Sequence, residues 1–402
     1  MPKQQHILEH IKTQAQNIFP KVVAIRRQIH QYPELAFEEY QTAKLVADFL
    51  KELGLQVQEG VAKTGVVALL KGAKPGRVIA LRADMDALPI QEANPVEYAS
   101  CINGKMHACG HDAHTASLLG CAAILTTLKD ELPGQVKFIF QPSEEKEPGG
   151  ASVMIQEGVL KNPAPQAIIA QHVASYLPVG KIGIRAGEYM ASADEIRIVI
   201  RGKGGHGAQP HTCIDPIVIA AQIIVTLQQL VSRVADPRIP TVLTFGKIEA
   251  QGATNVIPDT AYLEGTFRTF DEKWRTQAHQ WIQKTVKGIA ESLGAEVNIQ
   301  LQKGYPVLYN DVLLTQQIRE NIAFYVGEEN IEELPIWMAS EDFAFYTHHI
   351  PGCFYRLGTR NESKGIVHPV HTPYFNIDED ALRISTGLMA WLTYCYLISH
   401  SS

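Results

Sequence analysis

The chain has 402 residues, of which 46% are hydrophobic and 19% are charged, and its formal net charge at pH 7 is -6. This length is enough for two or three domains with buried cores, and the composition is that of a soluble globular protein. Acidic and basic residues are mixed along the chain without a basic block, which argues against nucleic acid as a partner.

Neither the N-terminal residues nor the apolar runs indicate a membrane partner. Residues 1–6 lead into a polar, amphipathic segment that lacks the apolar core of a signal peptide. The longest apolar runs, 217–227 and 387–398, are shorter than the roughly 20 residues that cross a bilayer. We therefore expect a cytoplasmic protein with buried apolar helices, whose six cysteines are free thiols.

Predicted helices and strands alternate through the first part of the chain. Apolar spacing, with bounding glycines and prolines, predicts helices over 7–30, 40–53 and 112–128 and strands over 66–70, 78–82, 136–140 and 167–170. Strands that alternate with helices are typical of a layered sheet covered by helices. The predicted fold class is therefore α/β, with a mixed, mostly parallel sheet flanked by helices.

The pattern changes near Gly183. The next predicted elements are a strand over 195–200, a helix from 216 to about 231, strands over 241–248 and 261–269, a helix over 271–293 and a strand over 296–301. This β-α-β-β-α-β order is that of a ferredoxin-like α+β module. We expect the module to be a domain inserted at 184–301, between the two parts, 1–183 and 302–402, of a discontinuous larger domain.

The run His107–His114 carries the densest group of metal-binding residue types. It holds one thiol, three imidazoles and one carboxylate within eight residues. Such ligands suit a transition metal such as zinc, manganese, cobalt or nickel. Without a metal, the same run would be only the polar start of a helix.

Further metal-type residues lie at the ends of predicted strands. In an open α/β sheet, sites form at the carboxyl ends of the strands. The residues placed at this edge are Asp84, Asp86, Cys109, His111, Glu144, Glu145 and His172. Each group also has a structural interpretation, as solvated turn residues, a charge run or a structural histidine. Their shared placement favours a metal site.

Hydrolysis at two metal ions explains why these residue types would be grouped. Two ions need a bridging ligand, which can be a carboxylate or a thiolate, and a shared water. One carboxylate of the pair Glu144-Glu145 can bind metal while its neighbour acts as general base. An outer carboxylate such as Asp86 can hold a ligand histidine in the required tautomer.

These residues resemble the M20 metallopeptidase clan in its amidohydrolase branch, which includes hippurate hydrolase and N-acyl-amino-acid deacetylases. The resemblance covers nearly the whole chain. The motifs that carry it are Arg26-Arg27 with His30, Pro33 and Glu34, then Arg82–Pro89, Cys109–His114, Gln141–Glu145, Gly204–His206, Asn255–Pro258, Ser340–Phe343 and His371–Pro373.

The resemblance implies two divalent transition-metal ions and assigns their ligands. The implied ligands are Cys109, His111, Glu145, His172 and His371. Glu144 would be the general base. Other branches of the clan have a histidine where this chain has Asp84, and a bridging aspartate where it has Cys109. Because a thiolate changes the softness and charge of the site, the metal stays open among zinc, manganese, nickel and cobalt.

The resemblance also gives the insert a role as a lid and dimerisation domain, so a homodimer or higher oligomer is expected. His206 matches the histidine that stabilises the oxyanion, often in a neighbouring subunit's site. Asn255 and Arg268 match groups that hold the polar end of the substrate, and a guanidinium can bind a carboxylate in a bidentate manner. Arg268 could instead be an arginine on the surface of a strand.

The expected activity is hydrolysis of N-acyl-L-amino acids to a carboxylate and a free amino acid through a metal-activated water. A dipeptidase or aminopeptidase of the same clan is the first alternative. A nicotinamide-dependent oxidoreductase would rest on the glycine run 202–207, but Pro210 and Pro216 follow where a dinucleotide site needs a helix. The acyl group and the amino acid stay open.

Overall fold

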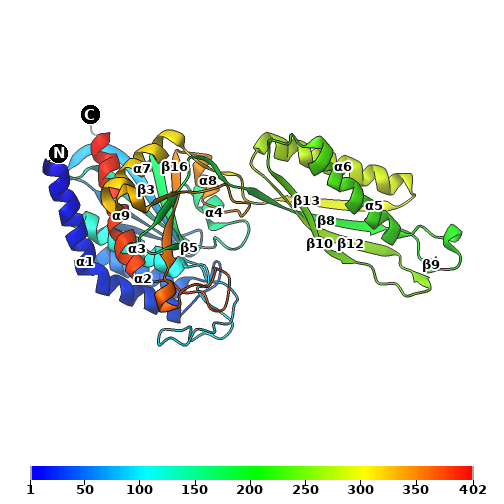
Figure 1. Ribbon diagram of the computed structural model, residues 1–402, viewed down its shortest axis with the longest axis horizontal. Coiled ribbons are helices and arrows are strands. Elements are labelled where there is room, and N and C mark those ends of the chain that lie inside the picture. The colour runs from blue at the N-terminus through cyan, green and yellow to red at the C-terminus, as the bar shows by residue number, and fades with distance from the viewer. Residues whose placement is uncertain (1, 401–402) are drawn as a thin grey trace. The chain divides into compact units, whose positions relative to one another are not determined.

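The computed structural model describes residues 2–400, and the chain divides into two compact units (Figure 1). Unit 1 comprises the described residues up to Gly187, Tyr309–Pro335, and those from Asp342 onward. Unit 2 comprises Glu188–Leu308 and Ile336–Glu341. The assignment of a catalytic role to residues 1–183 and 302–402, and of a lid role to 184–301, stays a prediction.

Unit 1 is built on an eight-stranded sheet with the order β1-β2-β4-β3-β5-β16-β6-β15. The central strands β4, β3, β5 and β16 are parallel to one another, while β1, β2 and β6 pair antiparallel with a neighbour. The strands are β1 Gln56–Val61, β2 Gly65–Lys71, β3 Lys74–Asp84, β4 Pro133–Gln141, β5 Ala167–Pro178, β6 Ile182–Ile184, β15 Ile331–Glu333 and β16 Gly352–Arg360.

Helices cover both faces of this sheet, as Figure 1 shows. Helices α1, α2, α3, α7 and α9 pack on one face, and the short helices α4 and α8 pack on the other. Their bounds are α1 Pro2–Gln31, α2 Tyr40–Glu52, α3 His111–Thr127, α4 Gly150–Gln156, α7 Val312–Val326, α8 Ala344–Thr347 and α9 Asp380–Ser399. The parallel strands are apolar on both faces because both faces are covered. The predicted α/β class is confirmed.

The strand ends place polar side chains at one edge of the sheet, and the strands run past their predicted ends, by one or two residues in β2, β3 and β4 and by eight in β5. Asp84 and Gln141 are the last residues of β3 and β4. The predicted end of the next strand at Ala170 is wrong, because β5 continues to Pro178 while pairing with β16. His172 therefore lies inside a strand rather than after it.

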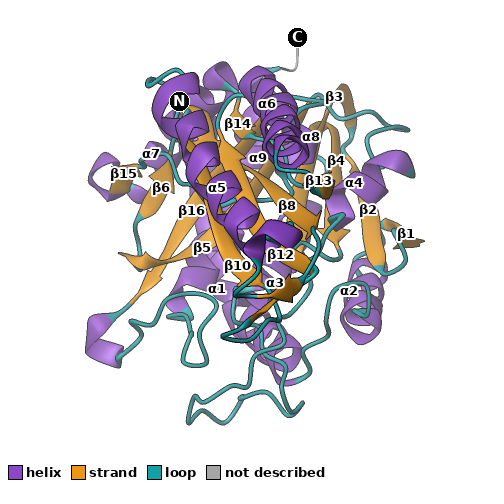
Figure 2. Cartoon of the chain, turned by 90° about the vertical axis from the view of Figure 1, so that its right-hand side faces the viewer, coloured by secondary structure: helices purple, strands orange, loops and turns teal. Residues whose placement is uncertain are grey.

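Unit 2 is a four-stranded antiparallel sheet with the order β10-β12-β8-β13, packed against α5 and α6 (Figure 2). Its elements follow the predicted ferredoxin-like order. They are β8 Ser192–Arg201, α5 Pro216–Gln229, β10 Thr241–Glu249, β12 Thr260–Thr269, α6 Glu272–Ser292 and β13 Glu296–Lys303. Along β8 the buried positions alternate with more exposed ones, because one face of the sheet carries the helices.

Several short elements complete the chain. They are β7 Gly187–Met190, β9 Gly205–His206, β11 Val256–Ile257, β14 Leu308–Asn310, the 3-10 turns Pro210–Thr212, Glu328–Asn330 and Glu362–Lys364, and the π-helical turn Leu230–Val234. β9 and β11 pair with each other in unit 2.

Two helices among the described residues have the length and apolar composition of a membrane span, Pro216–Val234 and Asp380–Ser399. The second is 83% buried over its apolar window, which is the position of a core helix, as predicted for the C-terminal run. The first is only 28% buried, so the expectation of a buried helix over 217–227 is wrong, and α5 presents apolar side chains such as Val218 and Val225 on the surface of unit 2.

Candidate metal centre

Five predicted ligand residues gather in unit 1 as two groups that share one thiol. Cys109 lies with His111 and His172 in the first group, and with Glu145 and His371 in the second. Within each group the possible ligand atoms lie within 4.8 Å of one another. The Sγ of Cys109 lies 3.3 Å from the Nε2 atoms of both His172 and His371. Two groups of ligands that share one thiolate would suit a pair of divalent ions.

The hydrogen bonds of two histidines leave the correct nitrogen available for a metal. Nδ1 of His172 donates to the carbonyl of Val173 over 2.8 Å, so its Nε2 faces Cys109 without a proton. Nδ1 of His111 lies 3.1 Å from Oδ1 of Asp86. Among the described residues, the buried Nε2 of His111 has no hydrogen-bond partner. This tautomer pattern, fixed by an outer acceptor, is typical of metal-binding histidines, so the residues fit a metal ion.

A further cluster beside the centre, formed by Asp84, His111 and His114, is already satisfied by protein groups. Arg82 and Nδ1 of His114 both donate to Asp84, over 2.5 and 2.6 Å. Nε2 of His114 accepts from the backbone N–H of Val173 over 2.9 Å, so neither of its nitrogens is left for a metal. Burial opposes ionisation of Asp84, but Arg82 and the two imidazoles outweigh it and hold its pKa well below the usual range. Asp84 is therefore a supporting anion.

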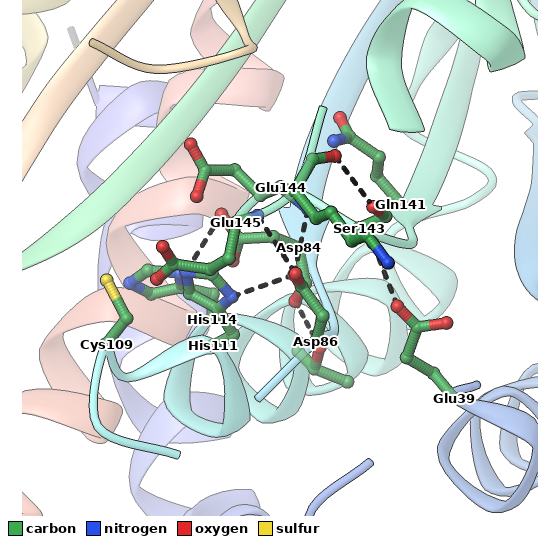
Figure 3. Close-up of polar contacts among 12 residues, drawn as sticks. Glu39, Asp84, Asp86, Cys109, His111, His114, Gln141, Ser143, Glu144 and Glu145 are labelled. Carbon is green, nitrogen blue, oxygen red and sulfur yellow. Dashed lines mark hydrogen bonds and ion pairs between the residues drawn. The ribbon is translucent and has the colours of Figure 1, made fainter. Parts of the chain in front are cut away.

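Asp86 connects a ligand histidine to the turn that carries the two glutamates (Figure 3). Besides His111, its carboxylate accepts the backbone N–H groups of Glu144 and Glu145, each over 3.0 Å. The side chain of Asp86 is 1% exposed, so these bonds are shielded from water. One carboxylate thus orients His111 and fixes the position of both glutamates.

The surroundings of Cys109 and His111 tie metal binding to proton loss. Burial raises the pKa of the Cys109 thiol well above its ordinary value, and Glu145 and Glu144 raise it further. Burial opposes protonation of His111, but Asp84 and Asp86 outweigh it and raise its pKa to about 10. A divalent ion would displace both protons as it binds.

Three backbone positions with positive φ shape the centre. Gly110, at φ 88°, precedes α3, and a Cβ there would lie 2.5 Å from the side chain of Val173. Ser143 and His371 have φ values of 51° and 62° although neither is glycine. Such conformations persist only where the surroundings hold them, and they concentrate at functional sites. The N–H of His371 donates to the carbonyl of Ala108 over 2.8 Å, which fixes that ligand loop to the segment before Cys109.

Sequence patterns missed the role of Asp342, although the motif Ser340–Phe343 contains it. Its buried carboxylate accepts from Arg82 over 2.8 Å, from Gln141 over 2.7 Å and from the N–H of Ala151 over 3.0 Å. Its own N–H lies 3.4 Å from Oε1 of Glu144. Asp342 therefore contacts the side chain of the predicted general base, whereas Asp86 holds its backbone.

In unit 2, the structure brings together two of the three predicted substrate-facing residues. β9 and β11 pair with His206 opposite Val256, and the N–H of Gly207 donates to the carbonyl of Asn255 over 2.8 Å. His206 and Asn255 are both exposed. Nδ1 of His206 accepts the N–H of Ala208 over 3.1 Å, so a neutral His206 carries its proton on Nε2.

Arg268 lies in the four-stranded sheet of unit 2, near the end of β12 that is far from the two-stranded β9–β11 sheet. It is the ninth residue of β12, which begins at Thr260, next to the β9–β11 pair. At roughly 3.3 Å per residue, the eight steps along the strand amount to about 26 Å. The guanidinium donates to the carbonyl of Met338 over 2.9 Å, and no ion pair to it occurs among the described residues. Burial lowers its pKa.

Comparison with known proteins gives consistent matches along the chain. The model of the peptidase family M20/M25/M40 matches residues 80–393. An N-acyl-L-amino acid amidohydrolase from Geobacillus stearothermophilus is 47% identical over 304 residues, covering 75% of this chain and 82% of the relative. Thermostable carboxypeptidase 2 from Saccharolobus solfataricus is 40% identical, covering 94% and 96%. The crystal structure of a dinuclear metal-binding M20 peptidase from Bacillus subtilis has a TM-score of 0.82 and 37% identity, covering 95% and 99%.

Proposed function

Because the chain belongs to the peptidase family M20/M25/M40, and is therefore a metal-dependent hydrolase of linear amide bonds, we propose that it cleaves N-acyl-L-amino acids. The products would be a carboxylate and a free amino acid. The observation that carries this proposal is the pair of ligand groups sharing Cys109, with the buried Glu144 beside them; Glu144 lies close to His111 and Glu145 but outside both groups that contain the thiol. The 47% identity to an N-acyl-L-amino acid amidohydrolase supports the class of substrate.

The proposed reaction divides the work between the metal centre and Glu144. Two divalent ions at Cys109, His111, Glu145, His172 and His371 would supply Lewis acidity and lower the pKa of water. Glu144 would accept the proton of the attacking water and deliver it to the leaving nitrogen. Asp86 would stay an acceptor and keep His111 and the glutamate turn in place.

His206 and Arg268 would act on the two ends of the substrate. A neutral His206 with its proton on Nε2 can donate a hydrogen bond to a developing oxyanion. Arg268 has no carboxylate partner in unit 2, so its guanidinium would bind the α-carboxylate of the substrate. Asn255, next to His206, would hold a second polar group.

The separation of about 26 Å along β12 supports a site completed by two subunits, because one small substrate cannot reach both ends of the strand. We infer that His206 and Asn255 serve the partner subunit's centre in a homodimer. Exposed apolar side chains on α5, including Val218 and Val225, and the edge strand β10 would supply the contact surface.

Subunit mixing tests this arrangement. The variants His206→Ala and Glu144→Gln would each be nearly inactive alone. In a mixed dimer, one centre would combine an intact Glu144 with the partner's intact histidine. Statistical mixing of symmetric dimers would then restore about a quarter of the wild-type activity. No recovery from dimers shown to have mixed would place His206 and Glu144 in the same subunit's site.

A peptidase is the second candidate, because a carboxypeptidase from Saccharolobus solfataricus is 40% identical over nearly the whole chain. Arg268 would serve both activities, since a C-terminal residue also carries an α-carboxylate. The metal-reconstituted protein should be assayed against N-acetyl and N-benzoyl amino acids and against dipeptides and blocked peptides. Our proposal predicts a kcat/KM at least tenfold higher for the best N-acyl-amino acid than for the best peptide. The reverse order would assign a peptidase.

A further inference from the structure

The turn that carries Glu144 and Glu145 is held by two buried carboxylates from different parts of the chain (Figure 3). Three consecutive backbone N–H groups donate to them. The N–H of Ser143 donates to Oε1 of Glu39 over 2.9 Å, and those of Glu144 and Glu145 donate to Asp86. Asp86 belongs to a recognised motif, whereas Glu39 lies immediately before α2 and nothing so far assigns it a role.

Glu39 is built into the protein as a hydrogen-bond acceptor. Its side chain is fully buried, and Oε1 also accepts the N–H of Phe37 over 3.0 Å. Oε2 accepts the hydroxyl of Thr64 over 2.5 Å. Both residues whose N–H groups reach Oε1 have positive φ, 61° at Phe37 and 51° at Ser143. A side-chain acceptor at these N–H groups stabilises a backbone conformation that residues other than glycine rarely adopt.

We propose that Glu39 is a positioning residue, which fixes the left-handed conformation of Ser143 and thereby the direction in which Glu144 points. Ser143 immediately precedes Glu144, so rotation about its φ and ψ would swing the base away from the reacting water. The other polar groups of Ser143 are also engaged, since its carbonyl accepts from the N–H of Gly150 over 2.7 Å and its hydroxyl donates to the carbonyl of Lys146 over 3.1 Å. The inference rests on the proposed function, in which Glu144 is the base.

The contact between Glu39 and the N–H of Ser143 depends on how far the accepting oxygen extends from the backbone rather than on the charge of the carboxyl group. Burial raises the pKa of Glu39 to about 7, the hydrogen bond from Thr64 opposes this rise, and Asp86 adds to it. A neutral carboxyl with its proton on Oε2 still leaves Oε1 to accept both N–H groups. Glutamine keeps such an oxygen at the same reach, whereas aspartate keeps the charge but is one methylene shorter.

The test compares Glu39→Gln and Glu39→Asp with wild type, with Glu38→Gln as the matched control. Glu38 is the adjacent carboxylate and is exposed, so its loss changes the charge without touching the turn. We measure kcat and KM on the best N-acyl-amino acid, the number of ions per chain by elemental analysis, and the melting temperature. Both Glu39 variants keep the size and polarity of the side chain close to those of glutamate.

We expect Glu39→Gln to keep kcat within about threefold, and Glu39→Asp to lower kcat by tenfold to a hundredfold, as a displaced catalytic group does. In both variants KM stays within about twofold and two ions stay bound. Three results would overturn the inference. The first is a fall in kcat below tenfold in Glu39→Asp, and the second is a fall in kcat in Glu39→Gln as large as that in Glu39→Asp. The third is a fall in kcat that is matched by missing ions or by unfolded protein. Failure of wild type to hydrolyse any N-acyl-amino acid would instead reject the proposed function.

Discussion

Replacing Glu144 with glutamine separates its proposed role as base from that of the neighbouring ligand. The side chain is 7% exposed and lies beside the N–H of Asp342, and glutamine keeps its shape and an oxygen for that contact. General acid–base catalysis contributes about 10²- to 10⁴-fold to a rate. We therefore expect kcat to fall by that factor, which corresponds to roughly 2.7 to 5.4 kcal/mol at 1.36 kcal/mol per tenfold change.

The assay pairs kcat with the number of bound ions, and Glu145→Gln is the matched comparison. Glu144 belongs to neither of the ligand groups that share Cys109, so Glu144→Gln should retain two ions. Glu145→Gln should lose both metal and activity, because Glu145 lies in the group with Cys109 and His371. A Glu144→Gln variant with kcat within threefold of wild type, or one that loses metal in proportion to activity, would refute this assignment.

Three further predictions follow from the buried charges. Cys109→Ala removes the ligand common to both groups, so elemental analysis after dialysis should find less than one ion per chain, and two retained ions would rule out a bridging thiolate. Metal affinity should rise between pH 6 and pH 9 by up to about a hundredfold per pH unit, because metal binding displaces one proton from Cys109 and one from His111. Calorimetry that detects no proton release on metal binding would contradict this. Asp112→Asn leaves buried Arg26 without its 2.7 Å partner and should lower the free energy of unfolding by about 3 to 5 kcal/mol in urea titrations. Burial opposes ionisation of Asp112, but Arg26 and His30 outweigh it and lower its pKa. The stabilisation by ionised Asp112 is therefore present above about pH 4 and is lost as the pH falls below that value. An acid-unfolding transition that is the same in Asp112→Asn as in wild type would contradict this.

Sequence patterns predict the fold well where local signals and topology agree. The alternation of β8 and the start of α5 follow from local chemistry, because Asp215 accepts N–H groups at the first turn of the helix. The convergence of Asp84 and Glu145 on one edge follows from a general rule, since Asp84 ends β3, Glu145 follows β4, and the carboxyl ends of parallel strands lie at the same edge of the sheet. The motifs shared with the M20 clan contain most of the residues that lie around Cys109 in the structure.

The rest depends on tertiary contacts that no local pattern contains. His172 ends an apolar run and therefore resembles a residue after a strand, but pairing with β16 extends the strand past it. Glu39 stands next to Glu38 and resembles one half of a solvated acidic pair. Only the folded chain shows that one of the two is exposed and that the other accepts two backbone N–H groups.

One titration tests the shared-thiolate centre most directly. The metal-free protein is titrated with a single kind of divalent ion, and the release of amino acid from an N-acyl-L-amino acid is followed. With zinc, manganese, cobalt or nickel in turn, we predict that activity is absent without ions and reaches its plateau at two ions per chain. Full activity at one ion per chain, or turnover that persists in the metal-free protein, would contradict a dinuclear amidohydrolase site built on Cys109.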